Sequence, residues 1–244
     1  MRTIPPIVKN LLIINILAFA AIFVFEKSQG IDLNHLLGLH FVRGEHFAPW
    51  QFITYMFMHE GWEHLFFNMF ALWMFGGIIE RTLGFKRFLI YYFVCGIGAG
   101  ICQEIAQLIQ YSDVTVIQAY HPLKHHLVDA YQAIDGINPI MGCVGASGAI
   151  YGILLAFGMI YPNERMFIIP IPFPIKAKYL VLGYAVIELM SVLTRAHDGV
   201  AHVAHLGGMI FGILLILFWR KQDNKRNNGG GATYVSFDNY NRGY

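Results

Sequence analysis

Gly145-Ala146-Ser147-Gly148 begins an apolar run that ends near residue 160, and Ala201-His202-Val203-Ala204-His205-Leu206-Gly207-Gly208 begins another further along the chain. Each stretch carries a hydroxyl or imidazole group into a segment long enough to cross much or all of a bilayer. A polar side chain inside a membrane costs several kcal/mol unless a partner satisfies it. Such a group is therefore a candidate functional site.

The composition is that of a membrane protein. Of the 244 residues, 56% are hydrophobic and 13% are charged, whereas roughly 25% of the residues in a soluble domain are charged. The formal net charge of +2 indicates neither a nucleic acid nor an acidic partner. The three cysteines lack a paired spacing, which argues against a disulfide framework.

Six apolar runs predict an all-α protein with six transmembrane helices. They cover residues 6–25, 63–79, 88–109, 147–160, 179–193 and 200–219. About 20 apolar residues match a hydrocarbon core of about 30 Å, but the fourth run has only about 14, or roughly 21 Å of helix. Residues 138–145 should therefore descend into the protein as irregular backbone whose polar groups are satisfied by protein or water. Ser147 would then begin a short helix below the membrane surface.

Residues 1–219 are predicted to form one membrane domain with two long extracytoplasmic segments. Residues 28–62 are rich in aromatic side chains and should lie partly in the outer leaflet. Residues 111–140 form a polar insert with apolar residues at helical spacing, typical of an amphipathic helix on the membrane surface. Residues 220–244 are rich in Asn and Gly, and we expect a disordered cytoplasmic tail.

The basic residues predict the orientation in the membrane. Six crossings place both termini on one side, and 13 of the 17 Lys and Arg residues fall on that side against 4 on the other. The positive-inside rule therefore places both termini in the cytoplasm. Ser147 and His202, and the pair His64 and Asn68 on one face of the second run, then lie in the extracytoplasmic half of the bilayer.

These residue types suit acyl transfer. A serine hydroxyl is a poor nucleophile until a base within hydrogen-bond reach takes its proton, and imidazole is the side chain that titrates nearest neutrality. We therefore expect His202 to be the base for Ser147. Attack by the serine on a carbonyl group forms an oxyanion, and each hydrogen-bond donor that stabilises it is worth about 2.7–4 kcal/mol. Asn68, His64 and the backbone N–H groups around Ser147 can provide such donors.

Small and aromatic residues support the same site. Gly145 and Gly148 allow close approach of backbone and substrate, and Tyr151, one turn after Ser147, can floor the site and hold the imidazole by stacking. Two stripes of small residues favour close helix packing. They are Gly148, Gly152 and Ala156, and Ala204, Gly208 and Gly212.

Residues 50–219 resemble the rhomboid family of intramembrane serine proteases. The resemblance rests on four motifs in a fixed order. They are His64-x-x-x-Asn68 after His59, Glu80 with Gly84, Gly145-x-Ser147-Gly148 with Tyr151, and Ala201-His202-x-x-His205-x-Gly207-Gly208.

This resemblance implies a six-helix rhomboid bundle with a two-residue catalytic pair and no acid. It makes Ser147 the nucleophile, His202 the base, and Asn68, His64 and the Ser147 N–H the oxyanion donors. The substrates would be transmembrane segments of other membrane proteins in a lipid bilayer, with no metal, cofactor or nucleic acid. We expect the protein to lie in a bacterial cytoplasmic membrane with its site open to the extracytoplasmic side. The sequence does not indicate the oligomeric state.

Other functions stay open at this stage. A catalytically silent rhomboid-like scaffold or chaperone would bind membrane clients, although such relatives typically lose the Ser or the His. A zinc enzyme would use His59, His64, His202 and His205, but the spacing is not the His-Glu-x-x-His of metalloproteases. A pH-gated transporter has the least support. One departure from the family pattern is Trp50-Gln51 where Trp-Arg is usual, which removes a cation that would fix the loop.

Overall fold

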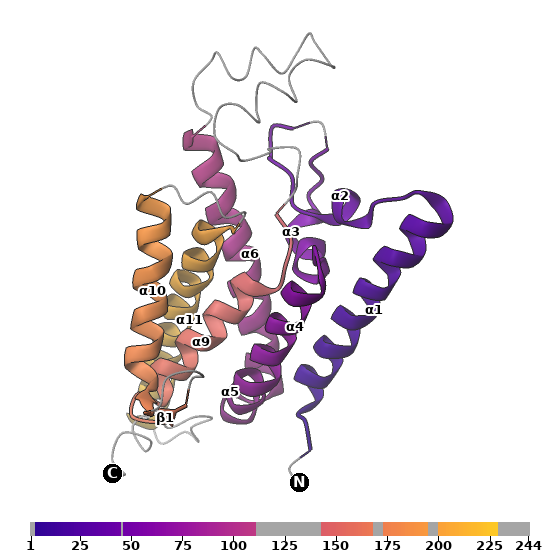
Figure 1. Ribbon diagram of the computed structural model, residues 1–244. Coiled ribbons are helices and arrows are strands. Elements are labelled where there is room, and N and C mark those ends of the chain that lie inside the picture. The colour runs from indigo at the N-terminus through magenta and orange to yellow at the C-terminus, as the bar shows by residue number, and fades with distance from the viewer. Residues whose placement is uncertain (1–2, 45, 111–142, 168–172, 195–199, 229–244) are drawn as a thin grey trace.

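The computed structural model is a bundle of helices that lie side by side (Figure 1). The structure describes residues 3–44, 46–110, 143–167, 173–194 and 200–228. Each of the six apolar runs folds as a helix or as consecutive helical segments. They are α1 (Pro6–Gln29), α4 (Trp62–Ala71) with a π-helical turn (Leu72–Gly76) and α5 (Gly77–Leu83), α6 (Phe85–Gln110), α9 (Ser147–Ile160), α10 (Ala177–Leu193) and α11 (His202–Asn228).

Short elements connect these helices. They are α2 (Leu33–Leu37), α3 (Gln51–Thr54), a 3₁₀ turn (Tyr55–Phe57), and the strands β1 (Arg165–Met166) and β2 (Ile175–Lys176), which pair antiparallel. The predicted bounds of the fourth run, 147–160, match α9, whereas α1 and α6 extend beyond the predicted runs. Among the described residues, α1, α6 and α11 are long and apolar enough to cross a membrane, and α9 is a shorter apolar helix.

The outer surface of the bundle is apolar. Large side chains on four different helices are 60–67% exposed, namely Leu17, Phe67, Leu182 and Phe218. An exposed apolar belt of this kind is suited to lipid and not to water. The bundle therefore has the surface of a membrane protein.

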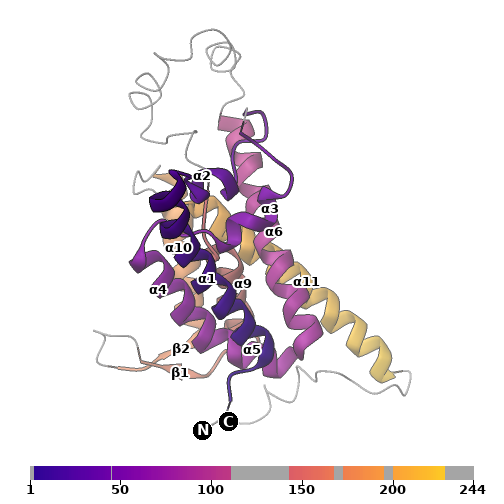
Figure 2. The ribbon, with the colours of Figure 1, turned by 90° about the vertical axis from the view of Figure 1, so that its right-hand side faces the viewer.

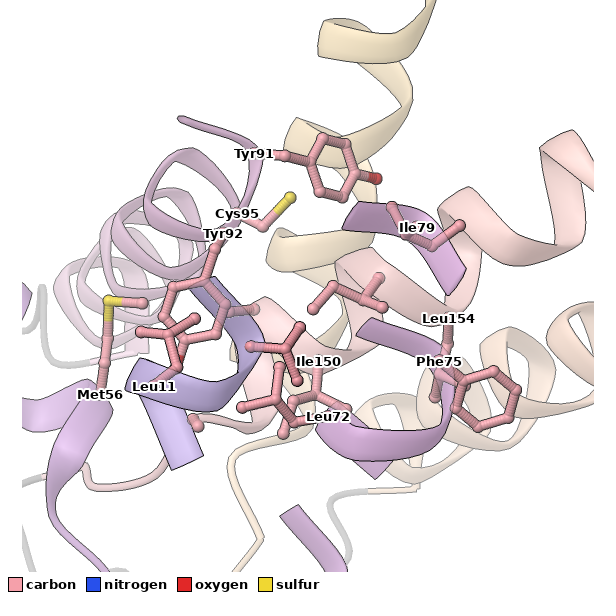
Figure 3. Close-up of a cluster of buried hydrophobic side chains, with 14 of the residues drawn as sticks. Leu11, Met56, Leu72, Phe75, Ile79, Tyr91, Tyr92, Cys95, Ile150 and Leu154 are labelled. Carbon is pink, nitrogen blue, oxygen red and sulfur yellow. The ribbon is translucent and has the colours of Figure 1, made fainter. Parts of the chain in front are cut away.

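α9 occupies the interior of the bundle. It packs against α6, α10 and α11, and Figure 3 shows side chains of α1, α5, α6 and α9 meeting in one buried cluster. A Cβ atom added to Gly208 of α11 would lie 1.9 Å from the carbonyl oxygen of Gly148. The backbones of α9 and α11 therefore touch where Gly148 faces Gly208, as the small-residue stripes predicted.

Two carboxylates connect neighbouring helices at one end of the bundle. Glu80 of α5 accepts the backbone N–H groups of Ile7 and Val8, at 3.0 and 2.8 Å, and so satisfies two donors that the start of α1 leaves open. Asp223 of α11 accepts two hydrogen bonds from Arg87 of α6, at 2.7 and 2.8 Å. α1 begins and α11 ends at this same end of the bundle (Figures 1 and 2).

The structure corrects part of the prediction for the tail and does not describe the insert. α11 continues to Asn228, so the first nine residues of the expected disordered tail are helical, with Asp223 buried against Arg87 as the physical reason. Residues 229–244 lie outside the described residues. The whole of the insert 111–140, including the expected amphipathic helix, also lies outside them.

Candidate active site

Ser147 begins α9 and is reached through a short irregular segment. Cys143 exchanges two backbone hydrogen bonds with Leu39, at 2.8 and 2.9 Å, and the Gly145 N–H donates to the carbonyl oxygen of Tyr55 at 2.9 Å. Gly145 has φ +122°, a conformation that side chains disfavour. The described part of residues 138–145 is thus irregular backbone whose polar groups are satisfied by protein, as predicted for this depth.

Ser147 is hydrogen-bonded to His205 and not to His202. The Oγ atom of Ser147 lies 2.8 Å from Nε2 of His205. The prediction that His202 would pair with Ser147 is therefore wrong. The reason is helical register: at 1.5 Å per residue, His202 lies about 9 Å along α11 from the contact at Gly208, whereas His205 lies only about 4.5 Å from it.

Tyr151 stacks on the imidazole that faces Ser147. The rings of Tyr151 and His205 are 4.1 Å apart between centroids and inclined by only 12°. The predicted stacking is confirmed in kind, although the ring that is held is His205 instead of His202. This packing fixes the plane of the imidazole from one side.

Glu188 of α10 connects the polar residues of the site, and the sequence analysis did not include it. Its carboxylate accepts a hydrogen bond from the Tyr151 hydroxyl, and its Oε2 lies 2.6 Å from Nδ1 of His202. Its Oε1 lies 3.1 Å from Nδ1 of His205, a close contact without the alignment of a hydrogen bond. The available signal was a single carboxylate in an otherwise apolar helix, which in a membrane indicates function by default.

His64 and Asn68 of α4 approach the same region. A Cβ atom on Gly145 would lie 2.6 Å from Nε2 of His64 and 3.7 Å from Oγ of Ser147, so both groups face the space that this glycine leaves open. Asn68 lies one turn further along α4 and is buried. Its Nδ2 group has no hydrogen-bond partner among the described residues. An unpaired buried donor is unusual in a native protein and calls for an explanation.

One group of described residues has the donor set for a metal ion. Ligand atoms of Glu188, His202 and His205 all lie within 4.8 Å of one another. Imidazole and carboxylate groups suit zinc, so the donor set fits that ion. The zinc set considered from the sequence is different, because His59 and His64 face each other at 5.0 Å between ring centroids instead of joining this group.

Gln51 fixes the loop before α4 without a cation. Its Oε1 accepts the N–H groups of His40 and Ala48, at 3.2 and 3.1 Å, and its Nε2 donates to the carbonyl oxygens of Leu36 and His46, at 3.3 and 2.9 Å. Only 1% of Gln51 is exposed. Four amide hydrogen bonds therefore anchor this loop where the usual arginine is missing.

The structure is thus a helical bundle with the apolar surface of a membrane protein, and a serine in its interior is hydrogen-bonded to a histidine. Residues 46–222 match the family model described as the Rhomboid domain, which is well over half of the chain. The chain belongs to the rhomboid family and is an integral membrane protein.

Named relatives are about a quarter identical to this chain over the residues that align with it. The chain is 29% identical to "Rhomboid protease AarA" of Providencia stuartii over 169 residues, 68% of this chain and 54% of that protein. It is 26% identical to "Putative rhomboid protease YdcA" of Bacillus subtilis, over 72% of this chain and 70% of that protein. It is 24% identical to "Rhomboid protease GlpG" of Salmonella paratyphi A, over 69% of this chain and 48% of that protein. The chain thus spans about half the length of two of these relatives.

Proposed function

We propose that this protein is an intramembrane serine endopeptidase that cleaves transmembrane segments of other membrane proteins. The observation that carries the proposal is the hydrogen bond of 2.8 Å between Ser147 Oγ and His205 Nε2 inside an apolar bundle. A nucleophile and a base within hydrogen-bond reach are the signature of covalent catalysis. In this proposal Ser147 remains the nucleophile, and His205 takes the role of base that was expected of His202.

The reaction runs through an acyl-enzyme. As Oγ of Ser147 attacks the scissile carbonyl carbon, Nε2 of His205 takes the hydroxyl proton. The C–N bond then breaks, and the imidazolium gives that proton to the leaving amine. A water molecule repeats the sequence on the ester, with His205 again as the base, and frees the new carboxylate and Ser147.

The oxyanion is stabilised by donors on two helices. Asn68 Nδ2 is buried and lacks a partner among the described residues, which suits a donor that finds its acceptor only during the reaction. His64 faces the open space at Gly145. The backbone N–H groups at the start of α9 have no side-chain cap and supply further donors.

The bundle crosses the membrane six times, with both termini in the cytoplasm. α1 begins and α11 ends at one end of the bundle, which is the end that carries Arg81, Lys86 and Arg87 at the junction of α5 and α6. The positive-inside rule assigns that end to the cytoplasm. α9 and α11 begin from the opposite end, so Ser147 and His205 lie in the extracytoplasmic half, and Ser147 keeps part of its surface exposed.

The names of the relatives point to the same activity. AarA and GlpG are named rhomboid proteases, whereas "Rhomboid-like protein 11, chloroplastic" of Arabidopsis thaliana, 27% identical over 209 residues, carries no activity in its name. This chain keeps both the serine and a histidine in contact with it. That pair favours the protease over a silent scaffold.

Labelling with a fluorophosphonate probe tests the proposal. Purified wild-type protein should be labelled, and the Ser147→Ala and His205→Ala variants should not be labelled. The same three proteins, reconstituted in liposomes with a single-span substrate, should show cleavage only for the wild type. Equal labelling of Ser147→Ala would remove the nucleophile, and loss of wild-type activity on treatment with a chelator would favour the zinc alternative.

A further inference from the structure

Glu188 is a carboxylate buried in an apolar helix. It is 4% exposed and belongs to α10, where it follows Val186 and Ile187 and precedes Leu189 and Met190. A carboxylate at such a place is expensive unless donors satisfy it. The question is therefore which groups stabilise Glu188, and what its charge does to them.

Two hydrogen-bonded groups and one closely placed nitrogen, from two neighbouring helices, surround this carboxylate. Tyr151 of α9 donates its hydroxyl, and Nδ1 of His202 lies 2.6 Å from Oε2. Nδ1 of His205 lies 3.1 Å from Oε1. An ionised carboxylate only accepts hydrogen bonds and has room for about four, so these contacts account for its burial.

The position of Glu188 relative to His205 determines where the imidazole proton lies. A neutral imidazole carries one N–H, and the nitrogen beside an acceptor-only group keeps it. Nδ1 of His205 faces Glu188, so Nε2 is left bare and points its lone pair at the Ser147 hydroxyl, 2.8 Å away. A base needs this tautomer to remove a proton from serine.

We propose that Glu188 is a positioning residue that completes a Ser147–His205–Glu188 chain and holds His205 in the tautomer required of the base. The inference rests on the proposed function. The usual pair has no acid, but here Tyr151 and His202 hold the carboxylate of Glu188 from two sides, and Tyr151 also stacks on His205. The contact between Nδ1 and Oε1 is short but poorly aligned, which is common before substrate binds and tightens the site.

The charge of Glu188 also matters once the proton moves. When His205 accepts the proton of Ser147, the imidazolium lies beside a carboxylate in an environment with little water. The attraction is stronger there than in water. Glu188 therefore favours the charged intermediate as well as the correct ground-state tautomer, as the aspartate of a Ser-His-Asp triad does.

The test compares full-length wild type with Glu188→Gln and Glu188→Asp in detergent micelles. The amide of Glu188→Gln is nearly isosteric but is a poorer partner for Nδ1–H. We expect the rate of fluorophosphonate labelling and the kcat for a transmembrane substrate to fall by about 10²- to 10⁴-fold. The upper limit is the loss of kcat that follows when the carboxylate of a Ser-His-Asp triad becomes an amide. KM should change by less than about threefold, because Glu188 does not touch substrate. Glu188→Asp should recover part of the kcat.

Glu104 provides a matched control. It is also a buried glutamate in an apolar helix, 4% exposed, but its carboxylate accepts the N–H of Val42 at 2.7 Å and, among the described residues, bonds neither Ser147 nor His205. Glu104→Gln should therefore label within about threefold of wild type. Equal losses in the Glu104 and Glu188 variants would overturn the proposal, because they would show a general effect of removing a buried carboxylate.

A second measurement does not depend on activity. In protein labelled with ¹⁵N-histidine, the resonances lost in His205→Gln identify the ring nitrogens of His205. We expect Nδ1 protonated and Nε2 bare in wild type, and a shift toward the opposite tautomer in Glu188→Gln at unchanged melting temperature. An unchanged tautomer, or activity that needs zinc bound to these residues, would overturn the proposal. Failure of wild type to label would instead overturn the proposed function, while the tautomer would still be measured.

Discussion

The phenol ring of Tyr151 lies flat against the imidazole of His205, with 4.1 Å between the ring centroids and 12° between the planes. The same tyrosine donates its hydroxyl to Glu188. Tyr151 therefore has two separable contributions, a stack that orients the imidazole and a hydrogen bond that orients the carboxylate.

Two substitutions separate these contributions. Tyr151→Phe keeps the stack and loses one donor to Glu188, so we expect labelling to slow by roughly 3- to 10-fold, as for the loss of one hydrogen bond of about 1 kcal/mol. Tyr151→Leu also removes the stack, worth about 0.5–1.5 kcal/mol beyond buried area, and should slow labelling by a further 3- to 10-fold. Rates of fluorophosphonate labelling measure both steps. Identical rates for the two variants would mean that the ring does not hold His205.

The two histidines of α11 should differ sharply. His205→Ala removes the group at 2.8 Å from Ser147 and should abolish labelling. His202→Ala removes a donor to Glu188, 2.6 Å away, but leaves the Ser147–His205 hydrogen bond in place, and should keep at least about a tenth of the wild-type rate. The measurement is labelling of the two variants beside Ser147→Ala at matched concentration. The reverse order of activity would restore His202 as the base.

The sequence predicted the helices well because apolar length alone defines a membrane helix. The bounds of α9 agree with the prediction, and Ser147 stands at its first residue. The length of the apolar runs does not show whether His202 or His205 faces Ser147. The two residues are three apart on one face of α11, and only the contact between Gly148 and Gly208 shows which of them is level with Ser147.

Glu188 and Gln51 illustrate a second limit. Glu188 makes its hydrogen bonds with residues of other helices, 14 and 37 positions away, and Gln51 makes its four with residues 3 to 15 positions before it. From the sequence alone, Glu188 is a single carboxylate in an apolar run, and Gln51 is the absence of an anchoring cation. A sequence gives the type of a polar side chain in a membrane, but its partners follow from helix packing.

Asn68 should affect activity more than stability. Its Nδ2 group has no partner among the described residues, so Asn68→Ala removes few interactions from the resting protein. If the amide donates to the oxyanion, its loss should lower kcat by about 10²- to 10³-fold, with a change in unfolding free energy below about 1 kcal/mol. Substrate cleavage and thermal unfolding in detergent measure the two effects. A large loss of stability with little loss of kcat would assign Asn68 to helix packing.

Gly208 should be essential for packing α9 against α11. Gly208→Ala places a Cβ atom 1.9 Å from the carbonyl oxygen of Gly148, so the helices must separate. We expect destabilisation of about 1–3 kcal/mol or more and loss of the Ser147–His205 hydrogen bond. Gly183→Ala in α10 is the control, since nothing lies within 4 Å of an added Cβ there. Its stability should be equal to or above that of wild type, because alanine favours a helix over glycine.

His59 should make the protein less stable in acid. It lies just before α4, is 1% exposed, and neither ring nitrogen has a partner among the described residues. Burial, and next the charge of His64, lower the pKa of His59 from 6.5 to about 3. Because the folded state binds the proton less readily than the unfolded state, the stability due to neutral His59 is complete above about pH 6.5 and is lost as the pH falls toward about 3.

The size of this effect at pH 5 follows from the unfolded pKa. With 1.36 kcal/mol for each unit between 6.5 and 5, the loss is about 2 kcal/mol. His59→Gln has no titrating group at this position, so its unfolding free energy should fall by about 2 kcal/mol less than that of wild type between pH 7.5 and pH 5. Unfolding in detergent at the two pH values measures the difference. Equal losses in both proteins would show that His59 takes up its proton in the folded state, and that the space around it admits water.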